Sequence, residues 1–216
     1  MDLNLIVVLL LAKEFYVIVA ECSSTKTRYF GPPPQPVPGE HWMQAAAREL
    51  RKIRQGSYEC LEEKPLGMED GRISDDSITA SSYFGTNLPH APFRARLNTE
   101  GAPASWSLGS SDTNPWIQVE FHDWVYITGL ITQGRGEDGF SNQRVTEYQA
   151  AYSNDGQNWV GVTDISGHAI VFPGNIERGS NVTNRFQTLR TRFIRILPTA
   201  WIDHCSMRFE VLGCYA

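Results

Sequence analysis

Apolar and polar residues alternate with a period of two from residue 60 onward. The clearest runs are residues 117–121 and 207–211, in which every second residue is apolar. Such alternation predicts strands that turn one face toward a core. Asp155 and Gly156 form a pair that is typical of a hairpin turn. No segment of helical period and convincing length occurs in residues 60–214, so this part of the chain is predicted to be an all-β sandwich or barrel.

The first 20 residues predict export from the cell. Residues 3–12 form an apolar run that is too short to span a bilayer, and Ala20 offers a small residue at a signal-peptidase cleavage site. The alternative is an uncleaved signal anchor, because Lys13 and Glu14 interrupt the apolar stretch. We expect a signal peptide at residues 1–20 and a secreted, extracellular protein.

Two short segments precede the all-β part. Residues 21–39 contain a cluster of prolines, which predicts a stiff, proline-rich linker. Residues 40–56 have apolar side chains at helical spacing and predict a short amphipathic helix that ends at Gly56. This helix either packs on its neighbour or supports self-association. Residues 57–216 are expected to form one domain.

The cysteines and one sequon agree with an extracellular location. After cleavage the chain keeps Cys22, Cys60, Cys205 and Cys214, and four cysteines allow three disulfide pairings. Asn181 begins the sequence Asn-Val-Thr, which predicts N-glycosylation.

Seven phrases between residues 60 and 214 occur in the order of a known family. They are CLEEKPLGMEDGRISDDSITASS, ARLNTEGAPASW, PWIQVEF, ITGLITQGR, VTEYQAAYSNDGQNW, VFPGN and RFIRILPTAWIDHCSMRFEVLGC. In these phrases the chain resembles the discoidin family, the coagulation factor five and eight type C domain. The resemblance implies a jelly-roll β-sandwich of about eight antiparallel strands, with its ends joined by a Cys60–Cys214 disulfide. It also implies three loops, the spikes, that project from one end near residues 83–92, 98–104 and 135–143.

Several residues are assigned to the scaffold. Alternation places Cys205 on the same face as the apolar residues of 207–211, which favours a buried free thiol over a bridge to Cys22 or to another molecule. Arg96 and Arg195 are expected to make internal ion pairs or carbonyl contacts. Four tryptophans lie in framework phrases and are expected to pack in or beside the core: Trp106, Trp116, Trp159 and Trp201.

The candidate ligand-binding residues lie on or beside the first and third spikes. They are Tyr83, Phe84, Asn87, Leu88, His90, Arg94, Arg135, Glu137, Asp138 and Phe140. Aromatic rings can stack on a sugar while polar side chains bind its hydroxyls, so a cell-surface glycan is the first predicted ligand. Apolar loop tips beside basic residues also suit an anionic phospholipid such as phosphatidylserine. The acidic residues beside Phe140, and the lack of tryptophan in the first spike, favour the glycan.

Other classes of function fit less well. A matrix or receptor protein is the third candidate ligand, although Arg-Gly-Glu at residues 135–137 is one methylene longer than the integrin-binding tripeptide. The net charge of −5 argues against nucleic acid. The sequence lacks the common hydrolase and phosphate-binding motifs, so we expect no enzyme and no obligatory cofactor. Calcium near Asp75, Asp76 or Asn87 stays an open alternative, because some relatives bind it. The sequence thus predicts a secreted, lectin-like adhesion or recognition protein.

Overall fold

A computed structural model of the chain describes residues 16–22, 25–31, 36, 38–41, 44–45, 60, 62–85, 88–136, 142–177 and 179–216. The chain divides into two compact units, residues 1–59 and residues 60–216.

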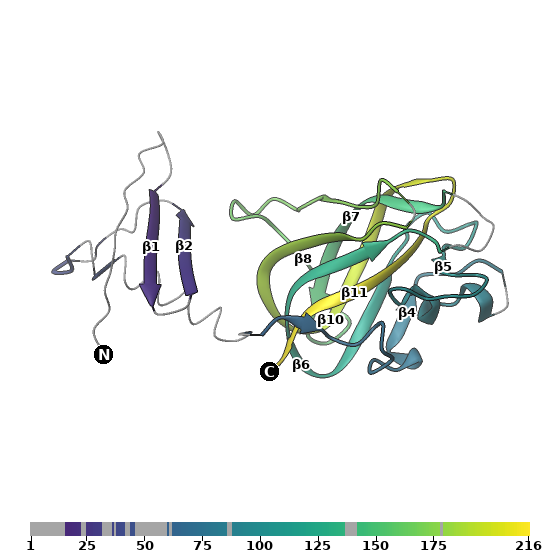
Figure 1. The fold of residues 1–216 in the computed structure, drawn as a ribbon, viewed down its shortest axis with the longest axis horizontal. Helices are drawn as coiled ribbons and strands as arrows, with labels where there is room; N and C mark the ends of the chain where they lie inside the picture. Colours follow the sequence, from purple (N-terminus) through teal and green to yellow (C-terminus); the bar gives the residue numbers. More distant parts are fainter. Residues whose placement is uncertain are drawn as a thin grey trace. The chain divides into compact units, whose positions relative to one another are not determined.

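The first unit contains a two-stranded hairpin. Strands β1 (Tyr16–Cys22) and β2 (Thr25–Gly31) pair antiparallel along their whole length (Figure 1). Gln44 and Ala45 are helical, and the rest of the predicted helix at 40–56 lies almost entirely outside the described residues. Most of the predicted signal peptide, residues 1–15, also lies outside them. Within the described part of the chain, no helix is long and apolar enough to cross a membrane.

In its described residues, the second unit is a β-sandwich with three short 3-10 helices. Its elements are β3 (Lys64–Pro65), η1 (Asp75–Ser77), β4 (Ile78–Ala80), η2 (Leu88–His90), η3 (Pro92–Ala95), β5 (Trp106–Ser107), β6 (Ile117–Gln133), β7 (Arg144–Ser153), β8 (Val160–Gly161), β9 (Phe172–Pro173), β10 (Val182–Ile202) and β11 (Ser206–Tyr215).

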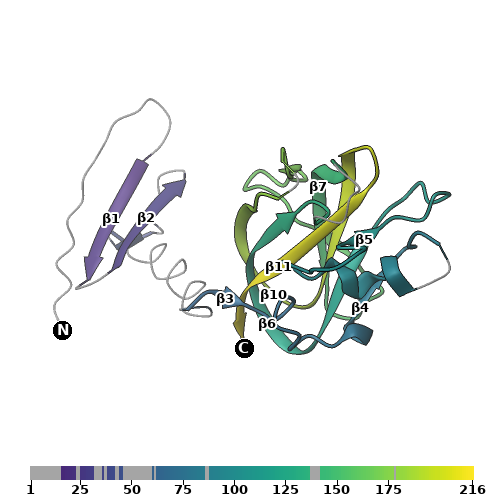
Figure 2. The same ribbon diagram turned by 45° about the vertical axis from the view of Figure 1, so that its right-hand side comes forward.

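Two long strands, β6 and β10, organise the sandwich. Their pairing is antiparallel, and so is that of every other ladder between named strands of this unit. The first part of β6 pairs with β4 and with the second part of β10, which in turn pairs with β7. The remainder of β6 lies between β11 and the first part of β10. Figures 1 and 2 show β6, β10 and β11 running the length of this unit.

Irregular pairing bends the long strands. The β6–β10 ladder shifts register between Arg185 and Leu189 and again between Thr191 and Phe193. Such bulges kink a strand and increase its twist, so β6 and β10 change partners along their length. Gly213 lies at a further shift between β11 and β6, where a Cβ atom would collide with the carbonyl oxygen of Tyr126. This crossing therefore needs a glycine.

The core confirms the alternation seen in the sequence. The apolar residues of 117–121 and 207–211 are all buried, and Trp106, Tyr148 and Phe121 are among the largest buried side chains. The all-β, discoidin-type prediction is confirmed. Trp201 differs from the other framework tryptophans, because its side chain is 40% exposed near the end of β10.

The cysteines of this unit follow the predictions. Cys60 and Cys214 form a disulfide with their Cα atoms 5.4 Å apart. Cys205 is a buried free thiol. Arg96 makes the predicted internal contacts, since its guanidinium donates hydrogen bonds to the carbonyl oxygens of Met68 and Ile73 and pairs with Asp75.

Candidate functional site

The first spike is fixed at its base by the strand that follows it. The backbone N–H of Phe84 donates to the carbonyl oxygen of Ser107 on β5, at 2.8 Å. The indole N–H of the buried Trp106 donates to the carbonyl oxygen of Ser82, at 2.9 Å. These bonds hold the backbone at Phe84 against a rigid strand, so its side chain is presented from a defined position.

A pocket opens beside Phe84. Its volume is about 330 Å³ and its lining comes from four separate segments: Phe84, His90, Ser107, Arg135, Gln143, Asp203 and His204. Phe84 is 45% exposed, and its ring makes edge contacts with His90 and His204 at centroid distances of 5.3 and 5.8 Å. The pocket therefore combines an accessible aromatic ring with imidazole, carboxylate, amide and guanidinium groups.

Hydrogen bonds preorganise the polar wall of this pocket. Arg135 is almost fully buried and donates from Nη1 to Oε1 of Gln143, at 2.9 Å. The buried hydroxyl of Ser206 lies 2.9 Å from Oγ of Ser107 and 3.1 Å from Oε1 of Gln143. Nε2 of His204 donates to the carbonyl oxygen of Leu108, at 2.9 Å. A ligand would thus meet side chains that are already oriented.

The structure brings together three of the residues predicted from the sequence, Phe84, His90 and Arg135. Tyr83 is half-buried and packs against the core, whereas Leu88 is 67% exposed. Arg94 donates to the carbonyl oxygens of Glu100 and Pro103, so it braces the second spike. Asn87, Glu137, Asp138 and Phe140 lie outside the described residues.

Sequence reasoning missed the contribution of the turn between β10 and β11. Asp203 and His204 line the pocket, and Asp203 has a positive φ of 59° that suits a tight turn. The exposed side chains of Trp201 and Ile202 precede them. In the phrase WIDHCS, the polar pair Asp203-His204 lies between two apolar stretches. This pattern would have predicted a fourth loop at the end of the domain that carries the spikes.

A second, more polar groove lies beside the second spike. It has a volume of about 610 Å³ and is lined by Asn98, Thr99, Glu100, Gly101, Ala104, Gln133, Arg135, Gly136, Gly179 and Arg208. We call it the spike-two groove. Arg208 is nearly buried and donates from Nε to the carbonyl oxygen of Gly134 and from Nη1 to that of Thr99. Arg135 lines both the spike-two groove and the Phe84 pocket.

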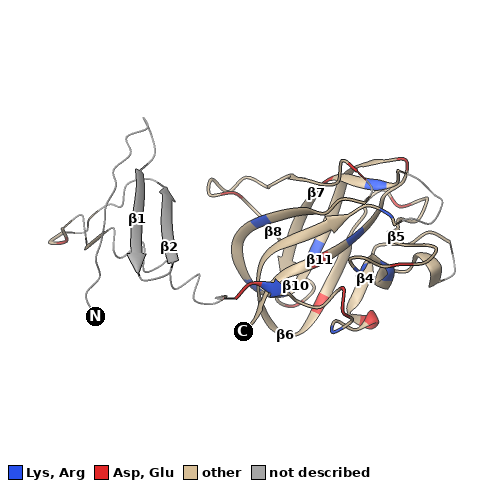
Figure 3. Ribbon diagram, viewed as in Figure 1, with Lys and Arg blue, Asp and Glu red and all other residues tan. Residues whose placement is uncertain are grey.

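Charged side chains of both signs are spread over the described residues of the second unit (Figure 3). Among the described residues, no group of three or more His, Cys, Asp and Glu side chains could hold a metal ion. The carboxylate of Asp75, a candidate calcium ligand in the sequence, forms an ion pair with Arg96. Figure 3 shows basic and acidic residues dispersed along the strands and loops of the second unit.

Comparison with known proteins defines the family. The model of the F5/8 type C domain matches residues 77–211, so the chain belongs to this family of discoidin domains. Lactadherin from Sus scrofa is 38% identical over 161 residues, which cover 72% of this chain and 39% of lactadherin. Retinoschisin from Mus musculus is 35% identical over 180 residues, which cover 79% of each chain.

A solved structure supports the same assignment. Discoidin II from Dictyostelium discoideum aligns with a TM-score of 0.56 and 27% identity, over 63% of this chain and 53% of that chain. The chain thus spans less than two thirds of the length of lactadherin and of discoidin II.

Proposed function

We propose that this protein is a secreted, non-enzymatic recognition protein that binds cell-surface glycans in the Phe84 pocket. The observation that carries the proposal is the pairing of a half-exposed phenylalanine ring with oriented polar groups in one cavity. A sugar presents an apolar face to an aromatic ring and hydroxyl groups to polar side chains, which is the combination found here. The Cys60–Cys214 disulfide supports an oxidising, extracellular setting.

Each group has a role in this proposal. The ring of Phe84 is the stacking platform, and the carboxylate of Asp203 accepts hydrogen bonds from sugar hydroxyls. His90, His204 and Gln143 supply further directional contacts. Arg135 is a positioning residue, because its guanidinium holds Gln143 in place.

A specific observation also favours anionic phospholipid as a second candidate. Four apolar side chains are exposed on the first spike and at the end of β10: Phe84, Leu88, Trp201 and Ile202. Side chains of this kind can enter the membrane interface while nearby cations meet anionic headgroups. Trp201 supplies the tryptophan that the first spike lacks. A matrix or receptor protein is the third candidate.

The deciding experiment compares the purified, secreted full chain on a glycan array and on phosphatidylserine vesicles. We expect binding to a defined sugar that tolerates added salt and is competed by the free monosaccharide. Phe84→Ala should weaken it about tenfold, which corresponds to about 1.4 kcal/mol of lost stacking. Asp203→Ala should weaken it as well.

Leu88→Ala is the matched control, because Leu88 is exposed on the same spike and does not line the pocket. If the ligand is a glycan bound in the Phe84 pocket, Leu88→Ala leaves the affinity of the protein for it unchanged. If vesicles bind instead, and both Leu88→Ala and added salt weaken that binding, the protein is a membrane-surface adaptor and the glycan proposal fails. If neither surface binds the protein, the ligand belongs to the third class.

A further inference from the structure

The predicted glycosylation site lies next to the spike-two groove. Asn181 is exposed and immediately precedes β10, and Gly179, two residues earlier, lines the groove. The side chain of Asn175 is buried and donates from Nδ2 to the carbonyl oxygens of Ser180 and Thr132, at 2.7 and 3.0 Å. The backbone directly before Asn181 is therefore held against β6.

One glutamine connects Asn181 to the wall of the groove. Gln133 is 5% exposed and lines the groove. Its Nε2 donates both to Oδ1 of Asn181, at 2.6 Å, and to Oδ1 of Asn98, at 2.7 Å. Its Oε1 accepts the backbone N–H of Asn98, at 2.9 Å. The sequon asparagine and the start of the second spike are thus fixed by the same buried amide.

This hydrogen bond engages the oxygen of the asparagine amide and not its nitrogen. Oδ1 of Asn181 faces the buried Gln133, which leaves Nδ2, the atom that carries an N-linked glycan, unused by that contact. Thr183, the third residue of the sequon, is exposed and lies opposite Ile131 in the β6–β10 ladder. Both polar residues of the sequon therefore lie at the surface of the folded domain.

The groove can receive a sugar ring. Its volume of about 610 Å³ lies within the range of roughly 300–1,000 Å³ that is usual for small-ligand sites. Gly101 and Gly179 line it, and among the described residues neither has another atom within 4 Å of the position of a Cβ. Glu100 lines the groove and provides a carboxylate that can accept hydrogen bonds from sugar hydroxyls and from the N–H of an N-acetyl group.

We infer that Asn181 carries an N-linked glycan whose first sugars occupy the spike-two groove of the same molecule. The glycan covers the backbone of residues 98–101 and leaves the Phe84 pocket open to an external ligand. The spike-two groove is thereby reserved for the protein's own sugar. This inference does not depend on which ligand the Phe84 pocket binds.

The test uses variants that separate the sugar from the asparagine side chain. Thr183→Ala removes the sequon and keeps the Asn181–Gln133 hydrogen bond, whereas Thr183→Ser keeps the sequon and is the matched control. Enzymatic removal of the glycan is less suitable, since it leaves aspartate at position 181. The full chains are secreted from animal cells, and their intact masses are measured before and after treatment with peptide-N-glycosidase.

Hydrogen exchange then reports where the glycan lies. We expect wild type and Thr183→Ser to lose a glycan mass on treatment, and Thr183→Ala to show none. Amide exchange in residues 98–101 should be faster in Thr183→Ala than in the glycosylated forms, and exchange in residues 106–109, beside the Phe84 pocket, should be unchanged. An unmodified wild-type chain overturns the inference. So does a glycosylated chain whose residues 98–101 exchange at the same rate as those of Thr183→Ala.

Discussion

The thiol of Cys205 lies in the core, and this environment changes its pKa. It is buried at the start of the β11 region and belongs to the same apolar cluster as Met207 and Phe209. Burial, with a smaller effect of the negative charge of Asp112, raises the pKa of Cys205 from 9.0 to about 12. A thiol that keeps its proton so strongly is a poor nucleophile, so Cys205 acts as a small apolar side chain.

This raised pKa predicts a pH dependence of stability. The unfolded chain ionises the thiol from pH 9, whereas the folded protein keeps the proton up to about pH 12, so the free energy of unfolding falls as the pH rises through this window. Between pH 9 and 10, wild type should lose about 1 kcal/mol more than Cys205→Ala does. Urea denaturation of both proteins at the two pH values measures the difference.

Above pH 10 a second buried group, the phenol of Tyr148, also affects stability. Burial raises the pKa of Tyr148 to about 12 from 10.0, which adds a similar loss of stability above pH 10 in both proteins. Parallel pH profiles of wild type and Cys205→Ala between pH 9 and 10 would contradict the prediction.

The residues that line the Phe84 pocket show which side chains of a site can be predicted from short sequence phrases. The family phrases located Phe84, His90 and Arg135, because each lies on a spike that follows a recognisable framework segment. Asp203 and His204 come from a turn that is more than 100 residues away from Phe84 in the chain. Their proximity depends on the register of β10 against β7 and of β11 against β5, which periodicity alone does not define.

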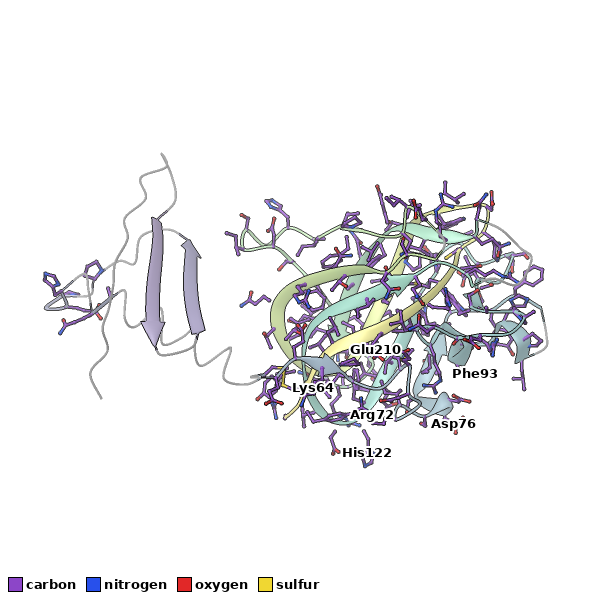
Figure 4. All side chains as sticks on the ribbon, in the orientation of Figure 1. Lys64, Arg72, Asp76, Phe93, His122 and Glu210 are labelled. Atoms are coloured by element: carbon purple, nitrogen blue, oxygen red, sulfur yellow. A yellow bond between two sulfur atoms is a disulfide. The ribbon has the colours of Figure 1, made fainter. Side chains whose placement is uncertain are left out.

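At the scale of elements, β11 differs most from its sequence pattern. Alternation predicts one apolar face, and Met207, Phe209 and Val211 are buried as expected. Arg208 and Glu210, on the other face, are buried too. Glu210, labelled on β11 in Figure 4, accepts backbone N–H groups from Met68, Glu69 and Val211 at 2.8–3.0 Å. The loop at residues 67–69, about 140 residues earlier in the chain, covers this face. Contacts this distant in sequence cannot be read from the alternation within β11.

A stacked arginine joins β10 to β6 and to the two tryptophans that immediately precede β6 and β8. Arg195 on β10 lies between the rings of Trp116 and Trp159, with its Cζ atom 4.1 and 3.7 Å from their centroids. Its Nε and Nη2 donate to Oε1 of Gln118 on β6, at 3.0 and 2.7 Å. Partial burial lowers the pKa of Arg195 from its ordinary value. The planar guanidinium suits both contacts, and an ammonium group does not.

Arg195→Lys should therefore reduce the free energy of unfolding by about 1–2 kcal/mol, although the charge is kept. Chemical denaturation monitored by tryptophan fluorescence measures the loss. Arg190→Lys is the control, because Arg190 is exposed and stacks on one ring, that of Trp124, at 4.2 Å. Its effect should stay within about 0.5 kcal/mol. Equal losses at the two positions would show that the double stacking contributes nothing.

At the scale of the whole domain, the disulfide and the Phe84 pocket lie near opposite ends of β11. The strand begins at Ser206, whose hydroxyl supports the Phe84 pocket, and the disulfided Cys214 lies near its other end. Eight residues of strand separate the two by about 27 Å, at roughly 3.4 Å per residue. The disulfide closes a loop with a sequence separation of 154 residues, so in the chain-entropy model it stabilises the fold by about 5 kcal/mol.

The double variant Cys60→Ser/Cys214→Ser should therefore lose several kcal/mol of stability and keep the ligand affinity of its folded fraction. Urea denaturation measures the first quantity, and titration with the sugar found on the array, at a temperature where the variant is still folded, measures the second. Phe84→Ala is the complementary control, since it should lose affinity while its stability changes little, its ring being half exposed. If the disulfide variant is folded and binds as weakly as Phe84→Ala does, the two ends of β11 are coupled and this division of roles is wrong.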